Sequence, residues 1–480
     1  MQSERNMTML VDFYEFTMMN GFFEKGENDK IAYFDMFFRR VPDGGGFAIM
    51  AGVEQLIEYI KEIKFTDADI EFLRGKGIFS EGFLEYLRTF KFVCDVWAIP
   101  EGTPIFPGEP CVIVRGPAIQ AQFVETMILL TINHQSLIAT KANRIVRAAQ
   151  GRTVMEFGSR RAQGYTGAVI GARAAYIGGV DGTACTMSDE LYGIKSLGTM
   201  AHSWVQMFDS EYEAFKAYAE TYPHSCTLLI DTYNVLKSGV PNAIKVFDEV
   251  LKPLGARPVG VRIDSGDITY LSNKCREMLD AAGYEDCKIV ASNSLDEYII
   301  RDMLLQGAKI DSFGVGERLI TSKSEPVFGG VYKLVAVEDN GSVIPKIKIS
   351  ENVAKITTPG FKQVHRLYSR KDSKAIADVI TLHDETIDDE KPINIFDPEH
   401  TWKKKSVSDF YSRELLKPIF IKGECVYDNP DIEVLREYCK IEVEGLWDEV
   451  KRFENPHAYY VDLSEKLWTM KHCMLEEYDN

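Results

Sequence analysis

The stretch that decides the fold is PVGVRIDSGDITYLSNKCREMLDAAGYEDCKIVAS, residues 258–292. Two short runs rich in β-branched residues, 258–264 and 287–292, enclose a segment with helical periodicity. The apolar residues of that segment recur every three or four positions and would share one helix face: Ile268, Leu271, Cys275, Met278 and Leu279. A strand, a helix and a second strand at this spacing predict a parallel strand pair with a right-handed crossover.

The same alternation continues on both sides of this stretch. It predicts further strands at 153–158, 197–202, 226–231 and 309–316, and helices at 241–255 and 295–304. Gly255, Gly283 and Gly307 stand where the helices should end, because glycine readily adopts the left-handed conformation found there. The fold class predicted is α/β, with an irregular parallel α/β barrel or a closely related sheet.

The flanking sequence differs from this rhythm and predicts a second, α+β domain built from both chain ends. The expected division is 1–135 for its N-terminal part, 136–335 for the catalytic barrel, and 336–480 for its C-terminal part with a helical tail. A basic run in and beside that last part would normally be a solvated face, or could supply positive charge to a polyphosphate: Lys333, Lys346, Lys348, Lys355 and Lys362.

Composition narrows the class of protein. The 480 residues carry 55 Lys+Arg and 72 Asp+Glu, a net charge of −17 that disfavours nucleic acid as a partner. The N-terminus lacks the pattern of a signal peptide, and the longest uncharged stretch, 126–140, is shorter than the ~20 residues that cross a bilayer. Nine scattered cysteines without zinc-site spacing predict reduced thiols, no protein-only metal site and a cytoplasmic protein.

A single histidine, His202, stands between the small residues of LGTMAH and a predicted helix. Ser203 could cap that helix, in which Phe208, Tyr212 and Phe215 recur at helical spacing. This segment alone is also consistent with a strand-to-helix joint that contains an incidental histidine.

Polar residues follow almost every predicted strand. In parallel α/β folds, functional groups gather where the strands end. The residues predicted to meet at that edge are Phe157, Arg160, Arg161, His202, Asp231, Arg262, Asp264, Ser292, Asn293, Gly314 and Gly316.

Each of these residue types has a chemical use and an ordinary structural alternative. Glycines 314 and 316 would let backbone N–H groups approach a phosphate, or would simply form a tight turn. The arginines could bind carboxylate or phosphate in a bidentate manner, or form surface ion pairs. Asp231 and Asp264 could balance these arginines, hold a Mg²⁺–pyrophosphate complex or steady a developing cation, or act as caps. Phe157 could stack on a flat ring or belong to the core.

Several motifs together resemble the nicotinate phosphoribosyltransferase family, in order and over nearly the whole chain. They are DFYEFTMMNGFF (12–23), FDMFFRRVPDGGGFAIMAG (34–52), EFGSRRAQG (156–164), GTMAHS (198–203), VRIDSGD (261–267), FGVGERLITS (313–322), GGVYKLVAV (329–337) and NPHAYYVDLSEKLW (455–468). The resemblance implies the type II phosphoribosyltransferase fold. It also implies transfer of phosphoribose from 5-phosphoribosyl 1-pyrophosphate (PRPP) to nicotinate, coupled to ATP hydrolysis through a phosphohistidine.

The resemblance also implies residue roles. His202 would be the phosphorylated histidine. Phe157 would stack on the pyridine ring, and Tyr14 of a neighbouring subunit would cover its other face, although Tyr14 could equally be one more apolar position on a buried helix. The other implied substrate and phosphate contacts are Arg160, Arg161, Asp181, Asp231, Arg262, Asp264, Ser292, Asn293, Gly314, Val315, Gly316, Glu317 (through its N–H) and, more weakly, Lys333. Mg²⁺ would accompany pyrophosphate and ATP, and a homodimer with shared active sites would form.

Four other functions remain to be distinguished. An enzyme that uses nicotinamide binds an amide in place of a carboxylate and needs no cation there. The arginines therefore favour nicotinate. A quinolinate phosphoribosyltransferase would be shorter and lack the histidine motif. A barrel lyase or aldolase would need a Schiff-base lysine at a strand end, and none of the predicted strands ends in lysine. A non-enzymatic binding protein is disfavoured by the intact set of His202, Arg262 and Asp264.

Overall fold

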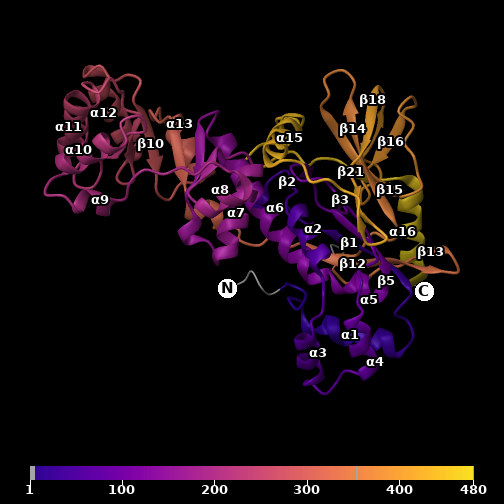
Figure 1. Cartoon of the computed structure of the whole chain (residues 1–480). Coiled ribbons are helices and arrows are strands. Elements are labelled where there is room, and N and C mark those ends of the chain that lie inside the picture. The colour runs from indigo at the N-terminus through magenta and orange to yellow at the C-terminus, as the bar shows by residue number, and fades with distance from the viewer. Residues whose placement is uncertain (1–5, 353–354, 479–480) are drawn as a thin grey trace. The chain divides into compact units, whose positions relative to one another are not determined.

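The computed structural model of the chain (Figure 1) describes residues 6–352 and 355–478. The chain divides into two units, Met1–Leu137 with Val327–Asn480, and Ile138–Pro326. The first division falls within the long helix α6 (Glu125–Ala148). The second lies earlier than the expected boundary at 335, because strand β12 (Val331–Asp339) pairs with β1 (Ile31–Phe37) of the first unit.

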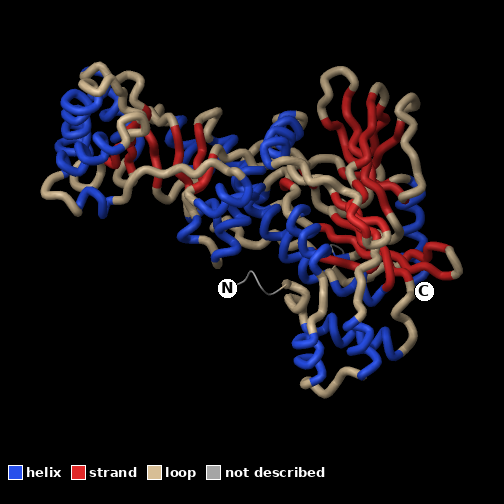
Figure 2. The backbone as a smooth tube through the Cα atoms, viewed as in Figure 1, coloured by secondary structure: helices blue, strands red, loops and turns tan. Residues whose placement is uncertain are grey.

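The unit Ile138–Pro326 is built on a six-stranded sheet in the order β7-β6-β11-β10-β9-β8, in which every neighbouring pair is parallel. Its strands are β6 (Thr153–Glu156), β7 (Gly182–Thr183), β8 (Thr227–Leu229), β9 (Gly260–Ile263), β10 (Lys288–Ser292) and β11 (Ser312–Val315). Figure 2 shows these red strands bordered by blue helices. Within the described residues no ladder pairs β7 with β8, so the hydrogen-bonded sheet is open at these two edges.

The strands of this unit are short and nearly continuously buried, as expected for a parallel sheet covered by helices. The covering segments are α7 (Tyr165–Ile177), α8 (Thr186–Tyr192), α9 (His202–Gln206), α10 (Glu211–Thr221), α11 (Val240–Val246), α12 (Ile268–Ala281), α13 (Glu297–Leu305) and α14 (Glu317–Ile320). Further helical turns are η2 (Ser159–Arg161), η3 (Val235–Gly239) and η4 (Phe247–Leu251). Gly283 and Gly307 follow the ends of α12 and α13 with φ of +83° and +81°, the conformation that glycine adopts without strain.

The predicted strand at 197–202 is wrong. In the described part of the chain, residues 197–202 bond to this sheet through Leu197 N–H, which donates to Thr183 O over 2.8 Å, and β7, which the sequence did not reveal, occupies the edge instead. The predicted cap at Ser203 is also wrong, because α9 begins at His202 after Ala201. The helix expected through Phe215 is interrupted: α9 ends at Gln206, and Ser210 caps a new helix by accepting from Glu213 N–H. The small residues around Gly198 provide too little apolar surface to order a strand.

The other unit contains a seven-stranded sheet, β13-β12-β1-β5-β3-β19-β20, and a four-stranded sheet, β18-β14-β15-β21. Its remaining strands are β2 (Ala48–Ile49), β3 (Asp95–Ala98), β4 (Pro104–Ile105), β5 (Val112–Pro117), β13 (Ser342–Pro345), β14 (Lys362–Ser369), β15 (Ala375–Leu382), β16 (Ile393–Phe396), β17 (Lys404–Val407), β18 (Phe410–Glu414), β19 (Lys417–Ile421), β20 (Glu424–Cys425) and β21 (Val461–Leu463). Its helices, besides part of α6, are α1 (Phe13–Glu24), α2 (Val53–Glu62), α3 (Asp67–Arg74), α4 (Glu81–Arg88), α5 (Ala118–Phe123), α15 (Ile432–Glu444), α16 (Glu465–Tyr478) and the turn η1 (Pro42–Gly44).

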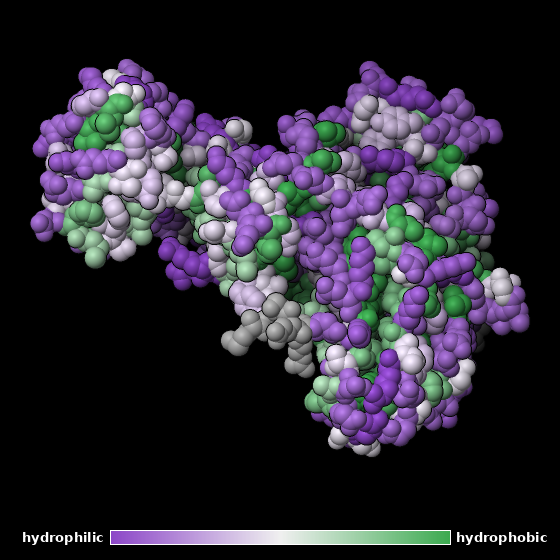
Figure 3. All heavy atoms as spheres, viewed as in Figure 1, coloured by the Kyte–Doolittle hydropathy of each residue, from purple (hydrophilic) through white to green (hydrophobic). Residues whose placement is uncertain are grey.

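One member of the basic run is not on a solvated face. Lys362 is 1% exposed and its Nζ lies 2.9 Å from Asp35 Oδ2, an acid that is itself buried. A buried ammonium requires such a partner, which explains the departure from the expectation. Elsewhere hydrophilic side chains cover most of the face seen in Figure 3. Among the described helices, none combines the length and apolar character needed to cross a membrane.

Candidate functional site

The polar residues that follow the strands do meet at one edge of the parallel sheet. A pocket of about 420 Å³ lies there, lined by Phe157, Ser159, Arg160, Ala184, Leu197, Gly198, Thr199, Met200, Ala201, His202, Leu229, Arg262 and Asp264. These residues come from segments far apart in the chain. They converge because parallel strands all end at the same edge of their sheet.

Two aspartates and an arginine form a connected polar network beside the pocket. Asp231, which is buried, accepts from Asp264 N–H over 3.0 Å and from Ser265 Oγ over 2.5 Å. Arg262 donates from Nη2 to Asp264 Oδ1 over 2.9 Å and from Nε to Ser292 Oγ over 2.8 Å. The Ser292 hydroxyl in turn donates to Asp264. Arg262, Ser292 and Asp264 form a closed ring that fixes the guanidinium and one carboxylate, and Asp231 is held beside it through the Asp264 N–H and Ser265.

His202 faces this network from the start of α9. Its Nδ1 lies 3.1 Å from Thr232 Oγ1, and its Nε2 lies 4.0 Å from Asp231 Oδ1 and 3.8 Å from Asp264 Oδ2. The side chain is 41% exposed and lines the pocket, so the imidazole is accessible to a ligand. In the tautomer in which Nδ1 donates to the threonine hydroxyl, Nε2 holds a free electron pair.

The position of Phe157 depends on the glycine opposite it. A Cβ atom on Gly314 would lie 2.5 Å from Phe157 Cδ2, so no larger residue fits there without moving the ring. The backbone N–H of Phe157 donates to Val315 O over 2.7 Å, and the Arg262 guanidinium lies 5.8 Å from the ring centroid. The ring is therefore held between strand β11 and the guanidinium of Arg262.

The segments expected to bind phosphate lie on neighbouring strands. Ser292 and Gly314 are direct partners in the β10–β11 ladder, so the residues after them emerge side by side. Asn293 continues from Ser292 with φ +81°, and Glu317 begins α14. The Glu317 carboxylate is turned toward Lys323, which lowers its pKa, and its Oε2 lies 4.0 Å from Arg161 Nε.

One predicted site residue of this unit, Asp181, is not brought to this edge. Asp181 accepts from Val154 N–H over 2.8 Å and therefore lies near the opposite, amino-terminal end of the sheet. Tyr14 and Lys333 belong to the other unit. There Tyr14 is 45% exposed on α1, and Lys333 Nζ lies 4.0 Å from Glu125 Oε1.

Two further residues complete the network, and the sequence assigned no role to either. Thr232 holds the imidazole, and Ser265 holds the buried carboxylate of Asp231. Each directly follows a strand-end aspartate, so the dipeptides Asp231–Thr232 and Asp264–Ser265 were the available signal.

The carboxylates of the network fit a cation that brings other ligands with it. Asp231 Oδ1 is buried without a hydrogen-bond partner, and Asp264 Oδ2 is the other carboxylate oxygen near Nε2. Across the described residues no group of three or more His, Cys, Asp or Glu side chains forms a metal site. Mg²⁺ typically binds through one or two carboxylates plus substrate phosphates, which matches this donor set.

Comparison with known proteins shows the family to which this chain is related. The N-terminal domain model of nicotinate phosphoribosyltransferase matches residues 9–133, the family model matches 153–369, and the C-terminal domain model matches 361–471. The nicotinate phosphoribosyltransferase of Bacillus subtilis is 42% identical over 472 residues, covering 98% of this chain and 96% of that protein.

Human proteins give the same result. The human nicotinate phosphoribosyltransferase is 30% identical over 519 residues, covering 96% of this chain and 95% of that protein. The crystal structure of the human nicotinic acid phosphoribosyltransferase superposes with a TM-score of 0.86 at 29% identity, covering 97% of this chain and 99% of that one. With all three domain models matched in order, and with relatives aligned over nearly their full length, this chain belongs to the nicotinate phosphoribosyltransferase family.

Proposed function

We propose that this protein transfers phosphoribose from PRPP to the ring nitrogen of nicotinate, as the first step of NAD salvage from nicotinate, and couples the transfer to ATP hydrolysis through a phosphorylated His202. The observation that supports this proposal best is the placement of His202 Nε2 beside Asp231 and Asp264, at the edge that also presents Arg262 and Phe157. Family membership supports the activity, and the geometry supports the assignment of roles.

In the transfer step, the bond from the nicotinate nitrogen to ribose C1 forms while the bond from C1 to the pyrophosphate oxygen breaks. Positive charge develops at C1 in the transition state and ends on the pyridinium nitrogen of the product, so the site must stabilise the charge at C1 transiently. The carboxylate of Asp264, fixed by Arg262 and Ser292, is suited to this task because its position needs no rearrangement.

The pyridine ring of nicotinate would stack on Phe157. Its carboxylate would pair with guanidinium groups of Arg160, Arg161 or Arg262, of which Arg160 and Arg262 line the pocket. We further propose a homodimer with shared active sites, in which Tyr14 of the partner subunit covers the other face of the ring. The exposure of Tyr14 supports this, since a side chain that is 45% exposed is available for such a contact.

The 5-phosphate of the ribose would bind to backbone N–H groups in the turn after β11 and to polar groups after β10. The residues proposed are Gly314, Val315, Gly316 and Glu317 in the turn, and Ser292 and Asn293 beside it. Glu317 would contribute only its N–H, because its carboxylate pairs with Lys323. Lys333 keeps its proposed contact from family resemblance alone, whereas Asp181, near the amino-terminal end of the sheet, is not retained as a substrate contact.

In the coupling step, His202 would attack the γ-phosphorus of ATP from Nε2. The N–P bond forms, the bond from that phosphorus to the β,γ-bridging oxygen breaks, and ADP leaves; water later hydrolyses the phosphohistidine. Thr232 supports this direction of attack because its hydroxyl engages Nδ1 and leaves Nε2 free. Two carboxylates lie within 4.0 Å of Nε2, and they would repel a phosphoryl group in the absence of a cation.

That repulsion supports the proposal that Mg²⁺ accompanies ATP and pyrophosphate, with Asp231 and Asp264 as the residues that would hold it. When bound, the ion would neutralise phosphate charge. The strand order β8-β9-β10-β11-β6-β7 also supports an irregular barrel, since it is the order of a barrel opened between β7 and β8. A cytoplasmic location is consistent with nine free cysteines.

The proposal is tested with γ-labelled ATP. The wild-type protein should acquire acid-labile phosphate in the presence of nicotinate and PRPP, and should turn over nicotinate in preference to nicotinamide. His202→Ala should lose the labelled phosphate and the coupled ATP hydrolysis while retaining slow transfer.

The matched control is His224→Ala. His224 is an exposed histidine in the turn before β8, away from the carboxyl edge, and its loss should leave labelling and transfer as in the wild type. Undiminished ATP hydrolysis in His202→Ala would contradict the role given to this residue.

A further inference from the structure

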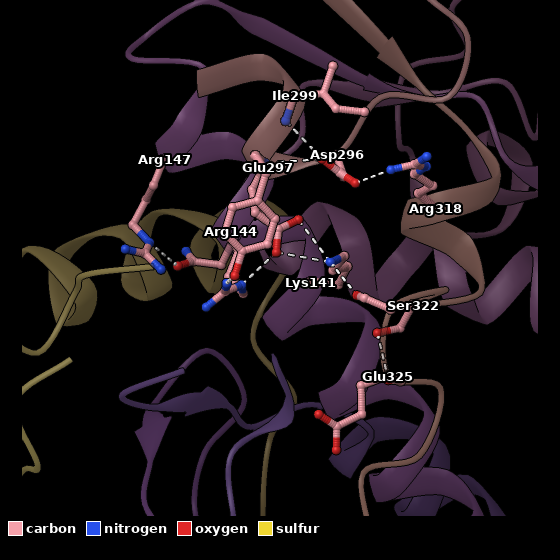
Figure 4. Close-up of polar contacts among 12 residues, drawn as sticks. Lys141, Arg144, Arg147, Asp296, Glu297, Ile299, Arg318, Ser322 and Glu325 are labelled. Atoms are coloured by element: carbon pink, nitrogen blue, oxygen red, sulfur yellow. Dashed lines mark hydrogen bonds and ion pairs between the residues drawn. The ribbon is translucent and has the colours of Figure 1, made fainter. Parts of the chain in front are cut away.

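The two segments proposed to bind phosphate are joined by an ion pair outside the pocket. One segment runs from the last residue of β10 to the residue before α13 (292–296, named here the β10–α13 loop), and the other runs from the end of β11 to the first residue of α14 (314–317, the β11–α14 turn). Asp296 ends the first segment and Arg318 follows the second, and Arg318 Nη1 donates to Asp296 Oδ2 (Figure 4). The side chains are 14% and 34% exposed, so this contact is largely shielded from solvent.

Asp296 has two separate tasks in this arrangement. Its Oδ1 caps α13 by accepting from Tyr298 N–H over 3.1 Å and Ile299 N–H over 2.9 Å. Its Oδ2 is left for Arg318. One carboxylate therefore fixes the start of α13 and connects it to the turn after β11.

The β10–α13 loop depends on such a connection. Asn293 and Ser294 have φ of +81° and +53°, and two consecutive non-glycine residues in this region persist only where their surroundings hold them. On the far side, the buried Glu297 anchors α13 to α6 through Lys141 and Arg144 (Figure 4). Glu297 fixes the position of helix α13 against α6. Asp296 links the start of α13 to the β11–α14 turn.

We infer that the Asp296–Arg318 ion pair is a positioning contact that sets the spacing between the β10–α13 loop and the β11–α14 turn for one phosphate group. This inference rests on the proposed function. Neither residue lines the pocket, and each acts through the backbone segment that it holds. A small displacement of one segment would separate the N–H groups that must converge on the same phosphate.

The test uses Asp296→Asn and Arg318→Met in the full-length enzyme. Asparagine caps a helix as well as aspartate does, so Asp296→Asn removes the charge and keeps the cap. Both variants should raise the KM for PRPP by about tenfold, with kcat changed less than about threefold and the KM for nicotinate unchanged. The double variant should lose no more than either single variant, because both remove the same contact.

Two inhibitors separate the phosphate subsites. Ribose 5-phosphate reports on the 5-phosphate alone, and pyrophosphate reports on the leaving group. The Ki of ribose 5-phosphate should rise with the KM for PRPP, and the Ki of pyrophosphate should stay constant. Arg318→Lys, which keeps the charge, should recover most of the affinity.

Asp302→Asn is the matched control, because it removes a charge from an exposed residue of the same helix α13 and should leave all constants unchanged. Equal weakening of ribose 5-phosphate and pyrophosphate would overturn the inference. So would an effect of Arg318→Met without one of Asp296→Asn, since Arg318 would then contact the ligand directly. A wild-type enzyme without PRPP-dependent activity would instead refute the proposed function itself.

Discussion

At the scale of single residues, two glycines shape the site because they have no side chain. Gly314 has no side chain, and that space is occupied by the ring of Phe157. Gly158, next to Phe157, is equally confined, because a Cβ there would lie 2.6 Å from Ile320 Cβ. The turn after β6 therefore packs directly against β11 and α14, and the aromatic ring fills the space that a side chain at position 314 would need.

Gly314→Ala should displace the Phe157 ring. The added methyl group cannot fit 2.5 Å from Cδ2, so we expect a loss of about 1–3 kcal/mol in stability and a rise in the KM for nicotinate that exceeds any rise for PRPP. Thermal unfolding and steady-state kinetics measure the two effects. Gly21→Ala, in α1 where nothing lies within 4 Å of the added Cβ, should be neutral or stabilising. A wild-type KM for nicotinate in Gly314→Ala would show that the ring position is unimportant.

At the scale of elements, a buried charge cluster joins α6 to α13. Glu297, which is fully buried, lies 2.8 Å from Lys141 Nζ and 2.8 Å from Arg144 Nε. Burial and the neighbouring Arg144 lower the pKa of Arg147 to about 10, which shows how unfavourable further positive charge is there. The cluster holds two helices together only while the carboxylate balances its cations.

Glu297→Gln should destabilise the fold strongly. The amide keeps the shape but leaves Lys141 and Arg144 buried without a counter-charge, a change that costs about 3–5 kcal/mol. Urea denaturation measures the loss. Glu277→Gln removes the exposed partner of Lys274 on α12 and should leave the midpoint almost unchanged. Equal midpoints for the two variants would mean that the buried cluster contributes nothing to stability.

At the scale of the whole molecule, the free energy of unfolding depends on pH through the buried carboxyl group of Glu15. Burial, together with the nearby carboxylate of Glu125, raises the pKa of Glu15 from 4.5 to about 8. Between these two values the folded state keeps a proton that the unfolded state has released. Stability from this group is therefore complete below about pH 4.5 and is lost as the pH rises through about 8.

Glu15→Gln should flatten the pH dependence of folding. The wild-type free energy of unfolding should fall from pH 5 to pH 8 by up to about 1.4 kcal/mol per pH unit more than that of the variant, whose amide is neutral throughout. Chemical denaturation at four pH values measures the difference. Glu24→Gln, an exposed position at the end of the same helix, should follow the wild-type curve. Parallel curves for wild type and Glu15→Gln would place the titration elsewhere.

The sequence by itself determined the parallel sheet and most of the residues at its edge. Regular alternation of apolar runs and helical periodicity reveals local structure, and parallel strands must end together, so Asp231, Arg262, Asp264 and Ser292 could be assigned to one site before their distances were known. The sequence motifs were sufficient to identify the family.

Only the tertiary structure decided the rest. The two-residue strand β7 replaced the strand expected at 197–202, because such a short segment is specified by its neighbours and not by its own pattern. Thr232 acquires its role from a histidine thirty positions away, and Asp181 lies at the opposite end of the sheet from the pocket. Lys362 proved buried against Asp35. Pairings between distant residues depend on how the chain packs, and no local pattern of residues records them.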